Sequence, residues 1–348
     1  MSETAEREAG GEQIVAEPTA MEPVGRRPSA VSRTADLLAR RREASIAFVA
    51  IVLFAFFWVQ HGAFFTTGNQ RVVTQFAAPM AMLAIAQVMN LVSGEIDLSL
   101  GHVFAFAPFV MLSAQDWGFP LPLAVVFAVI VASLVGLTNG LITVLTGVPS
   151  FITTLGMLFF LNGVTLHLSD ARPHRTPDGG FADWIGGANF SIFVWAVVLT
   201  VILHIVLTNT RWGVYTVATG GNPVGASEAG IRIRRVKICN FMIAAAIAGF
   251  AGICEGIRVR SFFPLAGGSE LMFFGVAAAV IGGTALFGGS GTMIGAFLGA
   301  FVISVLRDGL ILNGISAFTF NMILGAAIIA SMILNSGANR LRLRMRKT

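Results

Sequence analysis

The sequence predicts an all-α integral membrane protein with about ten transmembrane helices. The first observation is composition: hydrophobic residues make up 55% of the 348 residues and charged residues only 12%. Because a soluble protein carries roughly 25% charged residues, this chain is depleted about twofold. The second observation is a series of long apolar runs. In lipid only helices and closed barrels satisfy the backbone, and these runs are too long for barrel strands.

Ten apolar runs are candidate membrane spans, since a helix needs roughly 20 residues to cross the hydrocarbon core. They cover about 45–62, 72–92, 98–115, 121–146, 150–168, 190–208, 237–257, 270–287, 291–310 and 317–335. The third run is short and glycine-rich breaks lie near 282–291, so the count is open by one or two. The runs divide the chain into a polar, disordered arm at 1–42, a transmembrane domain at 43–336 and a basic tail at 337–348.

The basic residues predict the orientation of the chain in the membrane. With ten alternating spans and the N-terminus in the cytoplasm, 17 of the 23 Lys and Arg residues fall on the cytoplasmic side. This bias fits the positive-inside rule, so both termini, the arm and the tail are expected in the cytoplasm. Each basic cluster flanks an apolar span, which favours contact with membrane lipid and predicts no nucleic-acid partner.

Motifs for metals, cofactors and nucleotides are missing from the sequence. Cys239 and Cys254 have neither a metal-ligand spacing nor a disulfide pattern, and the five histidines are scattered. No phosphate-binding loop of the form GxxxxGK[ST] occurs, because the glycine-rich "GGTALFGGSG" lacks the lysine. That stretch predicts a helix break rather than a phosphate site. We therefore expect no metal and no cofactor in this chain.

A loop at 209–236 contains a predicted short helix. Asn222 followed by Pro223 is typical of a helix start, where Asn caps the free N–H groups and Pro fits the first turn. The following "VGASEAG" ends at Gly230, a residue typical of helix C-termini. Residue chemistry alone leaves two alternatives equally open: a docking helix parallel to the membrane, or a plain basic turn at the interface.

Four stretches resemble the motifs of one family, the permease subunits of ribose-type ATP-binding-cassette importers, in the branched-chain amino acid/monosaccharide permease superfamily. "GEIDLSLG" is similar to the family's Gly-Gly-Ile-Asp-Leu-Ser-Val-Gly motif, and "GVPSFITTLGMLFFLNGVTL" to its Pro-Phe-Ile-Val-Thr-Leu-Gly segment. "ATGGNPVGASEAGIRIRRVK" resembles the cytoplasmic coupling segment, and "AAVIGGTALFGGSGTMIGAFLGAFVISVLRDGL" the Gly-Gly-Thr-Ser-Leu-Ser-Gly-Gly region. The matches run in order between about 45 and 335.

The resemblance implies a transporter subunit for carbohydrate uptake rather than an enzyme, with a vitamin-B12-importer-like (type II) permease fold in the transmembrane permease domain. ATP is bound by a partner ATP-binding-cassette ATPase subunit, so the chain itself has no cofactor. An extracytoplasmic sugar-binding protein delivers the substrate, a monosaccharide or related polyol, and a second permease chain, identical or a paralogue, completes the pathway. The implied location is the bacterial plasma (inner) membrane, with several spans.

The resemblance also implies that the ATPase docks on the coupling segment. The residues carried over to this role are Asn222, Pro223, Ala226, Ser227, Ala229, Gly230, Ile231 and Arg232. The chain departs from the family pattern at Ala229, where Ser is common, at Arg307-Asp308, which replaces a typical Asn-Asn pair, and at Glu95, where Gly is usual.

Polar residues within or beside the apolar spans are candidates for the substrate path, because polar groups in lipid are costly unless paired or facing water. The path residues that we expect are Asn90, Glu95, Asp97, Ser99, Phe151, Thr153 and Asn162. Other polar residues of the spans are Gln75, Gln87, Asn139, Thr154 and Asn321. Hydrogen bonds between helices would explain each of them equally well.

The two acids of "GEIDLSLG" have three possible roles. They lie in a solvated turn or cap the next helix, they line a polar cavity where Gly94 and Gly101 break the helix, or they titrate and couple protons. We expect Asp97 to cap the next helix, and Glu95 to face a polar cavity or the cytoplasmic mouth.

Two other functions are alternatives to sugar uptake. One is a permease for nucleosides or branched-chain amino acids within the same superfamily. The other is a secondary transporter driven by an ion gradient, which predicts paired carboxylates near mid-membrane and inverted repeats. A membrane scaffold without transport would leave the four motif matches unexplained.

Overall fold

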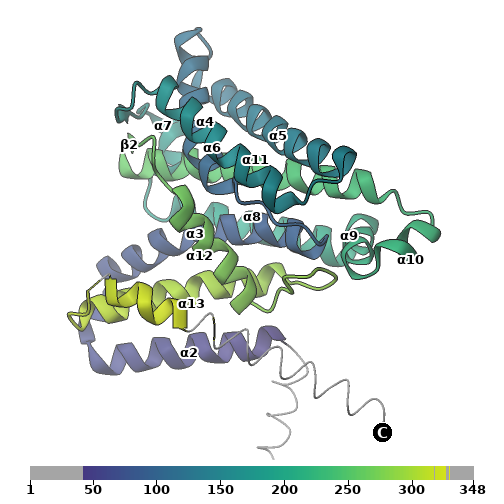
Figure 1. The fold of residues 1–348 in the computed structure, drawn as a ribbon. Coiled ribbons are helices and arrows are strands. Elements are labelled where there is room, and N and C mark those ends of the chain that lie inside the picture. Colours follow the sequence, from purple (N-terminus) through teal and green to yellow (C-terminus); the bar gives the residue numbers. More distant parts are fainter. Residues whose placement is uncertain (1–41, 317, 327–328, 330–348) are drawn as a thin grey trace, which may run out of the picture.

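The computed structural model describes residues 42–316, 318–326 and 329, and these form a bundle of helices (Figure 1). The predicted arm at 1–42 (except its last residue), the tail at 337–348 and much of the tenth predicted span lie outside the described residues. The long helices are α2 (Arg42–Gln60), α3 (Thr67–Val92), α4 (Leu100–Asp116), α5 (Leu121–Thr146), α6 (Ser150–Leu168), α8 (Ser191–Asn209), α11 (Ile233–Val259), α12 (Gly268–Ile281) and α13 (Met293–Leu312).

Short elements connect the long helices. They are η1 (Gly62–Phe65), α7 (Gly180–Ala182), η2 (Asp183–Gly187), α9 (Arg211–Gly221), α10 (Pro223–Glu228), β1 (His174–Arg175) and β2 (Ser261–Phe262). The two strands pair antiparallel and tie the loop before α8 to the segment after α11. All nine of these long helices overlap predicted apolar runs, because each run is long and rich in apolar residues.

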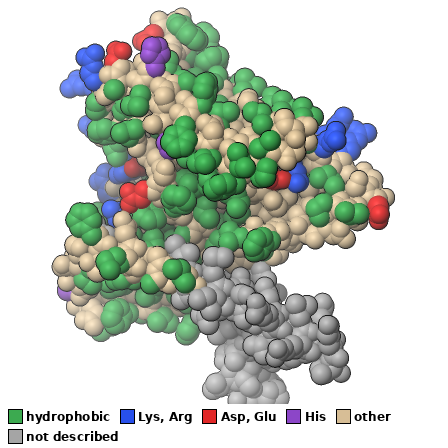
Figure 2. Space-filling view, viewed as in Figure 1, with side chains coloured by type: hydrophobic (Ala, Val, Ile, Leu, Met, Phe, Trp, Pro, Cys, Tyr) green, Lys and Arg blue, Asp and Glu red, His purple; other side chains and the backbone are tan. Residues whose placement is uncertain are grey.

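Among the residues that the structure describes, six helices are long and apolar enough to cross a membrane, namely α3, α5, α6, α8, α11 and α13. The apolar parts of α2 and α12 are shorter. An all-α membrane protein is therefore what the described residues form, while the count of about ten spans stays a prediction. Hydrophobic side chains cover the middle of the face in Figure 2, and charged side chains gather toward its two ends, as expected for a molecule surrounded by lipid.

Helix α3 lies at the centre of the bundle. It packs against α8, α11, α12 and α13, and almost all of its residues from Ala77 to Val92 are buried. Helices α5, α6 and α8 bury one side only and expose large apolar side chains such as Ile130, Phe160 and Val201. This pattern is typical of helices whose outer face contacts lipid. The central position of α3 means that both of its ends meet several other elements.

The bundle has two different ends. In Figure 1, α9 and α10 lie at one end, which we call the α10 end, and β2 lies at the opposite end, the β2 end. Helix α11 runs between them, from Ile233 near α10 to Val259 beside β2. Helix α12 stops at Ile281, six residues before its predicted run ends at 287. It stops there because Gly283, with φ of 91°, turns the chain into the glycine-rich break before α13.

Candidate functional site

The short helix predicted in the loop at 209–236 is present as α10. The side chain of Asn222 accepts a hydrogen bond from the N–H of Gly225 at 3.0 Å, which makes it the N-cap. At the other end, Gly230 has φ of 82°, and the N–H of Ile231 donates to the carbonyl oxygen of Ala226 at 3.0 Å. These are the features of a Schellman C-terminus. Local residue chemistry therefore fixes both ends of the helix.

Helix α10 has few contacts with the rest of the chain. Among the predicted coupling residues only Ala226 is buried and Ile231 is half-buried. The others are exposed, namely Asn222, Pro223, Ser227, Ala229, Gly230 and Arg232. Val224, on the same helix, has 69% of its surface exposed. A hollow of about 540 Å³ lies beside it, lined by Ser227 and residues 231–235. Such an exposed, well-capped helix can serve as a contact for another protein.

Three glycine-rich stretches meet at the C-terminal end of α3, and we call this contact the glycine junction (Val92, Gly94, Gly220, Gly221, Gly288 and Gly289). The N–H of Gly289 donates to the carbonyl oxygen of Val92 at 2.9 Å. A Cβ atom on Gly220 would lie 2.0 Å from that same oxygen. Only glycine allows the backbones to approach so closely. The junction joins the end of α9, directly before α10, to α3 and to the loop between α12 and α13.

The remaining matched stretch, "GVPSFITTLGMLFFLNGVTL", forms most of α6 and contacts the same region. The hydroxyl of Ser150 accepts a hydrogen bond from the N–H of Ile96 at 3.2 Å, and that of Thr154 accepts from the N–H of Leu98 at 3.0 Å. Both N–H groups belong to residues 93–99, which connect α3 to α4 and are not helical. All four stretches that carry the resemblance therefore come together around this connection.

Asp97 holds the turn before α4 but does not cap that helix, so this prediction is wrong. The N-cap is Ser99, and Asp97 Oδ1 accepts hydrogen bonds from the Ser99 N–H at 2.8 Å and from its hydroxyl at 2.6 Å. Asn139 of α5 donates to the same hydroxyl at 2.9 Å. The three side chains are fully buried, so the carboxylate orders the turn from inside the bundle.

Glu95 faces a polar cavity at the α10 end, one of the two positions expected for it. Lys237, one turn into α11, places its ammonium 2.5 Å from Glu95 Oε1. The carboxylate side chain is only 10% exposed and the lysine side chain 22%. Both residues line a cavity of about 310 Å³ together with Ser150 and Arg234. Lys237 was not predicted as the partner of Glu95, although a lysine at the start of an apolar span signals a paired charge.

The other expected path residues lie apart from one another. Asn90 is fully buried in α3, and within the described residues neither of its side-chain atoms has a hydrogen-bond partner. Thr153 is buried on α6, Asn162 is half-buried, and Phe151 has 52% of its surface exposed on the outer face. None of the seven lines the large cavity described next, and their role in a path stays a prediction.

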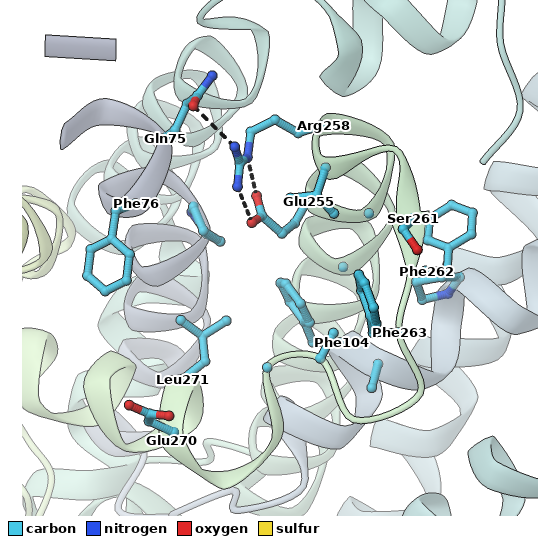
Figure 3. Close-up of a pocket in the computed structure, with 18 of the residues that line it drawn as sticks. Gln75, Phe76, Phe104, Glu255, Arg258, Ser261, Phe262, Phe263, Glu270 and Leu271 are labelled. Carbon is cyan, nitrogen blue, oxygen red and sulfur yellow. Dashed lines mark hydrogen bonds and ion pairs between the residues drawn. The ribbon is translucent and has the colours of Figure 1, made fainter. Parts of the chain in front are cut away.

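A cavity of about 540 Å³ opens at the β2 end (Figure 3). Its wall is formed by the N-terminal half of α3, by α4, by the last turns of α11, by β2, by the start of α12 and by Arg307 of α13. Much of the lining is aromatic or aliphatic, and the charged and amide side chains are Gln75, Glu255, Arg258, Glu270 and Arg307. This mixture of apolar walls and a few convergent polar groups is typical of small-molecule sites.

The polar groups of this cavity are held in fixed positions. Arg258 donates from Nε and Nη2 to the two carboxylate oxygens of Glu255, at 2.7 and 2.6 Å, and from Nη1 to Gln75 Oε1 at 3.1 Å. The guanidinium of Arg307 lies 3.8 Å from the centre of the Phe76 ring. Gln75 was among the polar residues noted in the sequence, but Glu255 was missed. An acid and a base three residues apart at the end of an apolar span are the signal for such a pair.

The described residues contain no group of His, Cys, Asp and Glu that could hold a metal ion. Comparison with known proteins gives a family. Residues 71–332 match the family described as branched-chain amino acid transport system / permease component. No solved structure shows a significant match.

Several curated proteins are similar over most of their length. The xylose/arabinose import permease of Sulfolobus acidocaldarius is 39% identical, over 86% of this chain and 86% of that protein. The ribose import permease of Escherichia coli K12 is 32% identical, over 78% and 86%. The autoinducer 2 import system permease of Photorhabdus luminescens is 28% identical, over 86% and 91%. The chain therefore belongs to the branched-chain amino acid transport system / permease component family, whose members are multi-pass membrane permeases.

Proposed function

We propose that this chain is the permease subunit of an ATP-driven importer that carries a monosaccharide or related polyol into the cell. The family and the similar xylose/arabinose and ribose import permeases support this proposal. The observation that carries it is the convergence of the four motif stretches between α10 and the α3–α4 connection. This arrangement links an exposed docking helix to the centre of the bundle.

A partner ATPase subunit docks on α10 in this proposal. The helix is capped at both ends by its own residues, so it keeps its shape without support from a large buried surface. Val224 on α10 and Arg232 just after it are both exposed, and exposed apolar residues and arginines are common in protein contact surfaces. ATP binds to that partner, and this chain contributes no nucleotide site.

Movement of the docked ATPase reaches the bundle by two routes. Through the glycine junction, α9 contacts the end of α3 backbone to backbone, and such a contact cannot yield by rotation of side chains. Through Lys237 and Glu95, the first turns of α11 are tied to the α3–α4 connection. Helices α3, α4 and α11 continue to the β2 end, where they form the wall of the large cavity.

The remaining features of the proposal follow the family. The α10 end faces the cytoplasm with both termini, and the β2 end faces outward, where a sugar-binding protein delivers the substrate. About ten spans in a vitamin-B12-importer-like fold, paired with a second permease chain in a bacterial plasma membrane, complete the assembly. The path includes Asn90 and Asp97 in this proposal, because buried polar groups need a polar occupant or partner.

A co-purification experiment tests the docking surface. Arginine at Ala226 or Gly230 would disturb α10 itself, since the first is buried and the second needs a positive φ. Val224→Arg changes only an exposed side chain, and Leu265→Arg, at a residue 67% exposed near β2, is the matched control. The ATPase should co-purify with the wild type and with the Leu265 variant but not with the Val224 variant. No binding to the wild type, or equal binding to both variants, would contradict the proposal.

A further inference from the structure

Apart from Arg307, the residues that line the cavity at the β2 end lie outside the four stretches that carry the family resemblance. We propose that it is a binding site for a neutral monosaccharide in the permease itself, with hydrogen bonds to Glu255, Arg258 and Gln75 and an apolar contact to Phe263. This inference rests on the import function proposed above and adds to it the site and the chemical class of ligand.

The charges of the cavity balance. Two carboxylates, Glu255 and Glu270, face two guanidiniums, Arg258 and Arg307, among the lining residues. In the bidentate pair between Arg258 and Glu255, each charge is already balanced by its partner. A charged ligand that displaced either partner would leave the other uncompensated at a largely buried site, which is costly. A neutral ligand with several hydroxyl groups can instead use the remaining lone pairs of the carboxylate.

Across the cavity from these polar groups the lining is mainly aromatic and aliphatic, with Glu270 beside Leu271. In Figure 3 the group of Gln75, Arg258 and Glu255 lies on one side, and Phe104, Phe263 and Leu271 lie across the cavity from it. The ring of Phe104 is fully buried and forms a floor, whereas Phe263 has 48% of its surface exposed. A monosaccharide has hydroxyl groups around its edge and C–H groups on its faces. The polar side and the aromatic side of the cavity match these two parts of such a ligand.

The position of the cavity connects it to the proposed coupling routes. Glu255 and Arg258 lie at one end of α11, and Lys237 lies at the other end of the same helix. Phe104 lies on α4, directly after the connection that Glu95 and Asp97 hold. A shift at the α10 end therefore moves the polar wall and the floor of the cavity relative to each other. A site built in this way would change its affinity when the ATPase changes state.

Protection of an introduced cysteine tests occupancy directly. Ser261→Cys places a thiol in the cavity wall, and Ser269→Cys places one at an exposed position of α12 that does not line the cavity. The full-length permease in nanodiscs is labelled with a maleimide, with the wild type as the background for Cys239 and Cys254. D-xylose at millimolar concentration should slow labelling of the first variant severalfold and leave the second unchanged. Equal labelling rates with and without xylose at position 261 would overturn the proposal.

Leucine and a second variant give the chemical specificity. Leucine is a zwitterion, so it should not protect the thiol at position 261, and protection by leucine but not by xylose would overturn the assignment to a sugar. Glu255→Gln keeps the shape of the side chain but removes its charge, and it should abolish protection by xylose. Asp170→Asn, in the exposed ion pair with Arg172, is the control and should keep protection. Loss of protection in both would contradict a specific role of Glu255.

Transport by the reconstituted importer separates this inference from the proposed function. Phe263→Ala should reduce uptake of labelled xylose at least severalfold, whereas Phe273→Ala, on an aromatic residue 57% exposed and outside the cavity, should not. Both should keep the ATPase bound and hydrolysing ATP. If the wild type imports xylose and both variants do so at its rate, the cavity assignment is wrong and the importer stands. If the wild type neither binds an ATPase nor imports sugar, the proposed function itself is wrong.

Discussion

Lys237 and Glu95 form an ion pair at 2.5 Å across 142 positions of sequence. The pair joins the first turns of α11 to the connection between α3 and α4, close to the exposed helix α10. Because both side chains are largely buried, the pair is more than a surface contact. It is a charged contact between α11, the helix that follows α10 in the chain, and the α3–α4 connection.

Breaking this pair should lower the stability of the protein and weaken the coupling between ATP hydrolysis and sugar import. Glu95→Gln leaves the ammonium of Lys237 without its partner, which we expect to cost about 1–3 kcal/mol, between the values for exposed and for buried pairs. The melting temperature in detergent should fall, and sugar import per ATP hydrolysed should fall with it. The exchange Glu95→Lys with Lys237→Glu should recover part of both losses. An unchanged import ratio in the single variant would show that the pair has no coupling role.

The glycine junction should not accept a single added methyl group. In Gly220→Ala the new Cβ would lie 2.0 Å from the carbonyl oxygen of Val92, so the backbones must separate, which costs about 1–3 kcal/mol or more. Gly68→Ala is the control, because nothing lies within 4 Å of its Cβ position in the first turn of α3. Thermal melting of the two variants gives the comparison. Equal melting temperatures would contradict the close packing of the junction.

The hydroxyl of Thr154 should matter more than its methyl group. Thr154→Val keeps the shape of the side chain but leaves the buried N–H of Leu98 without an acceptor, at a cost of about 1–3 kcal/mol. Thr138→Val, on an exposed face of α5, should change stability by less than about 0.5 kcal/mol. Melting temperatures in the same detergent provide the measurement. A loss at position 138 as large as that at 154 would assign the effect to α-helical propensity instead.

Phe287 should be a second contact for the ATPase. Its side chain is 92% exposed in the loop between α12 and α13, next to Gly288 of the glycine junction. Phe287→Ala should leave stability within about 0.5 kcal/mol of the wild type but weaken ATPase binding by at least about fivefold. Phe318→Ala, at a residue 83% exposed beyond the other end of α13, is the control. Equal ATPase affinity of both variants would remove Phe287 from the docking surface.

The sequence predicted the elements better than it predicted their contacts. Asn222, Pro223 and Gly230 fix α10 through interactions within a few residues, so the helix could be predicted from local chemistry. The long helices could likewise be predicted from the long apolar runs, because a run is a feature of consecutive residues. Contacts between distant segments have no such local signal, and the pairing of Glu95 with Lys237 became visible only once α11 was placed beside the α3–α4 connection.

The prediction that Asp97 caps α4 placed the N-cap two residues too early. A carboxylate before an apolar run is typical of an N-cap, but Ser99 occupies the N-cap position, and its hydroxyl donates a hydrogen bond to Asp97 instead of capping the helix. Glu255 was missed for a different reason. It lies inside the apolar run 237–257, and its partner Arg258 follows directly after that run. The cavity they line exists only when five helices come together.

The glycine junction is made by backbone atoms, and this has a consequence for how such a protein can change over evolutionary time. A contact without side chains does not depend on which side chains surround it. In the proposed assembly, Val224 and Phe287 can therefore diverge to suit a different ATPase while the proposed path of movement through Gly220 and Val92 stays intact. Choice of partner and transmission of force are separable traits in that assembly.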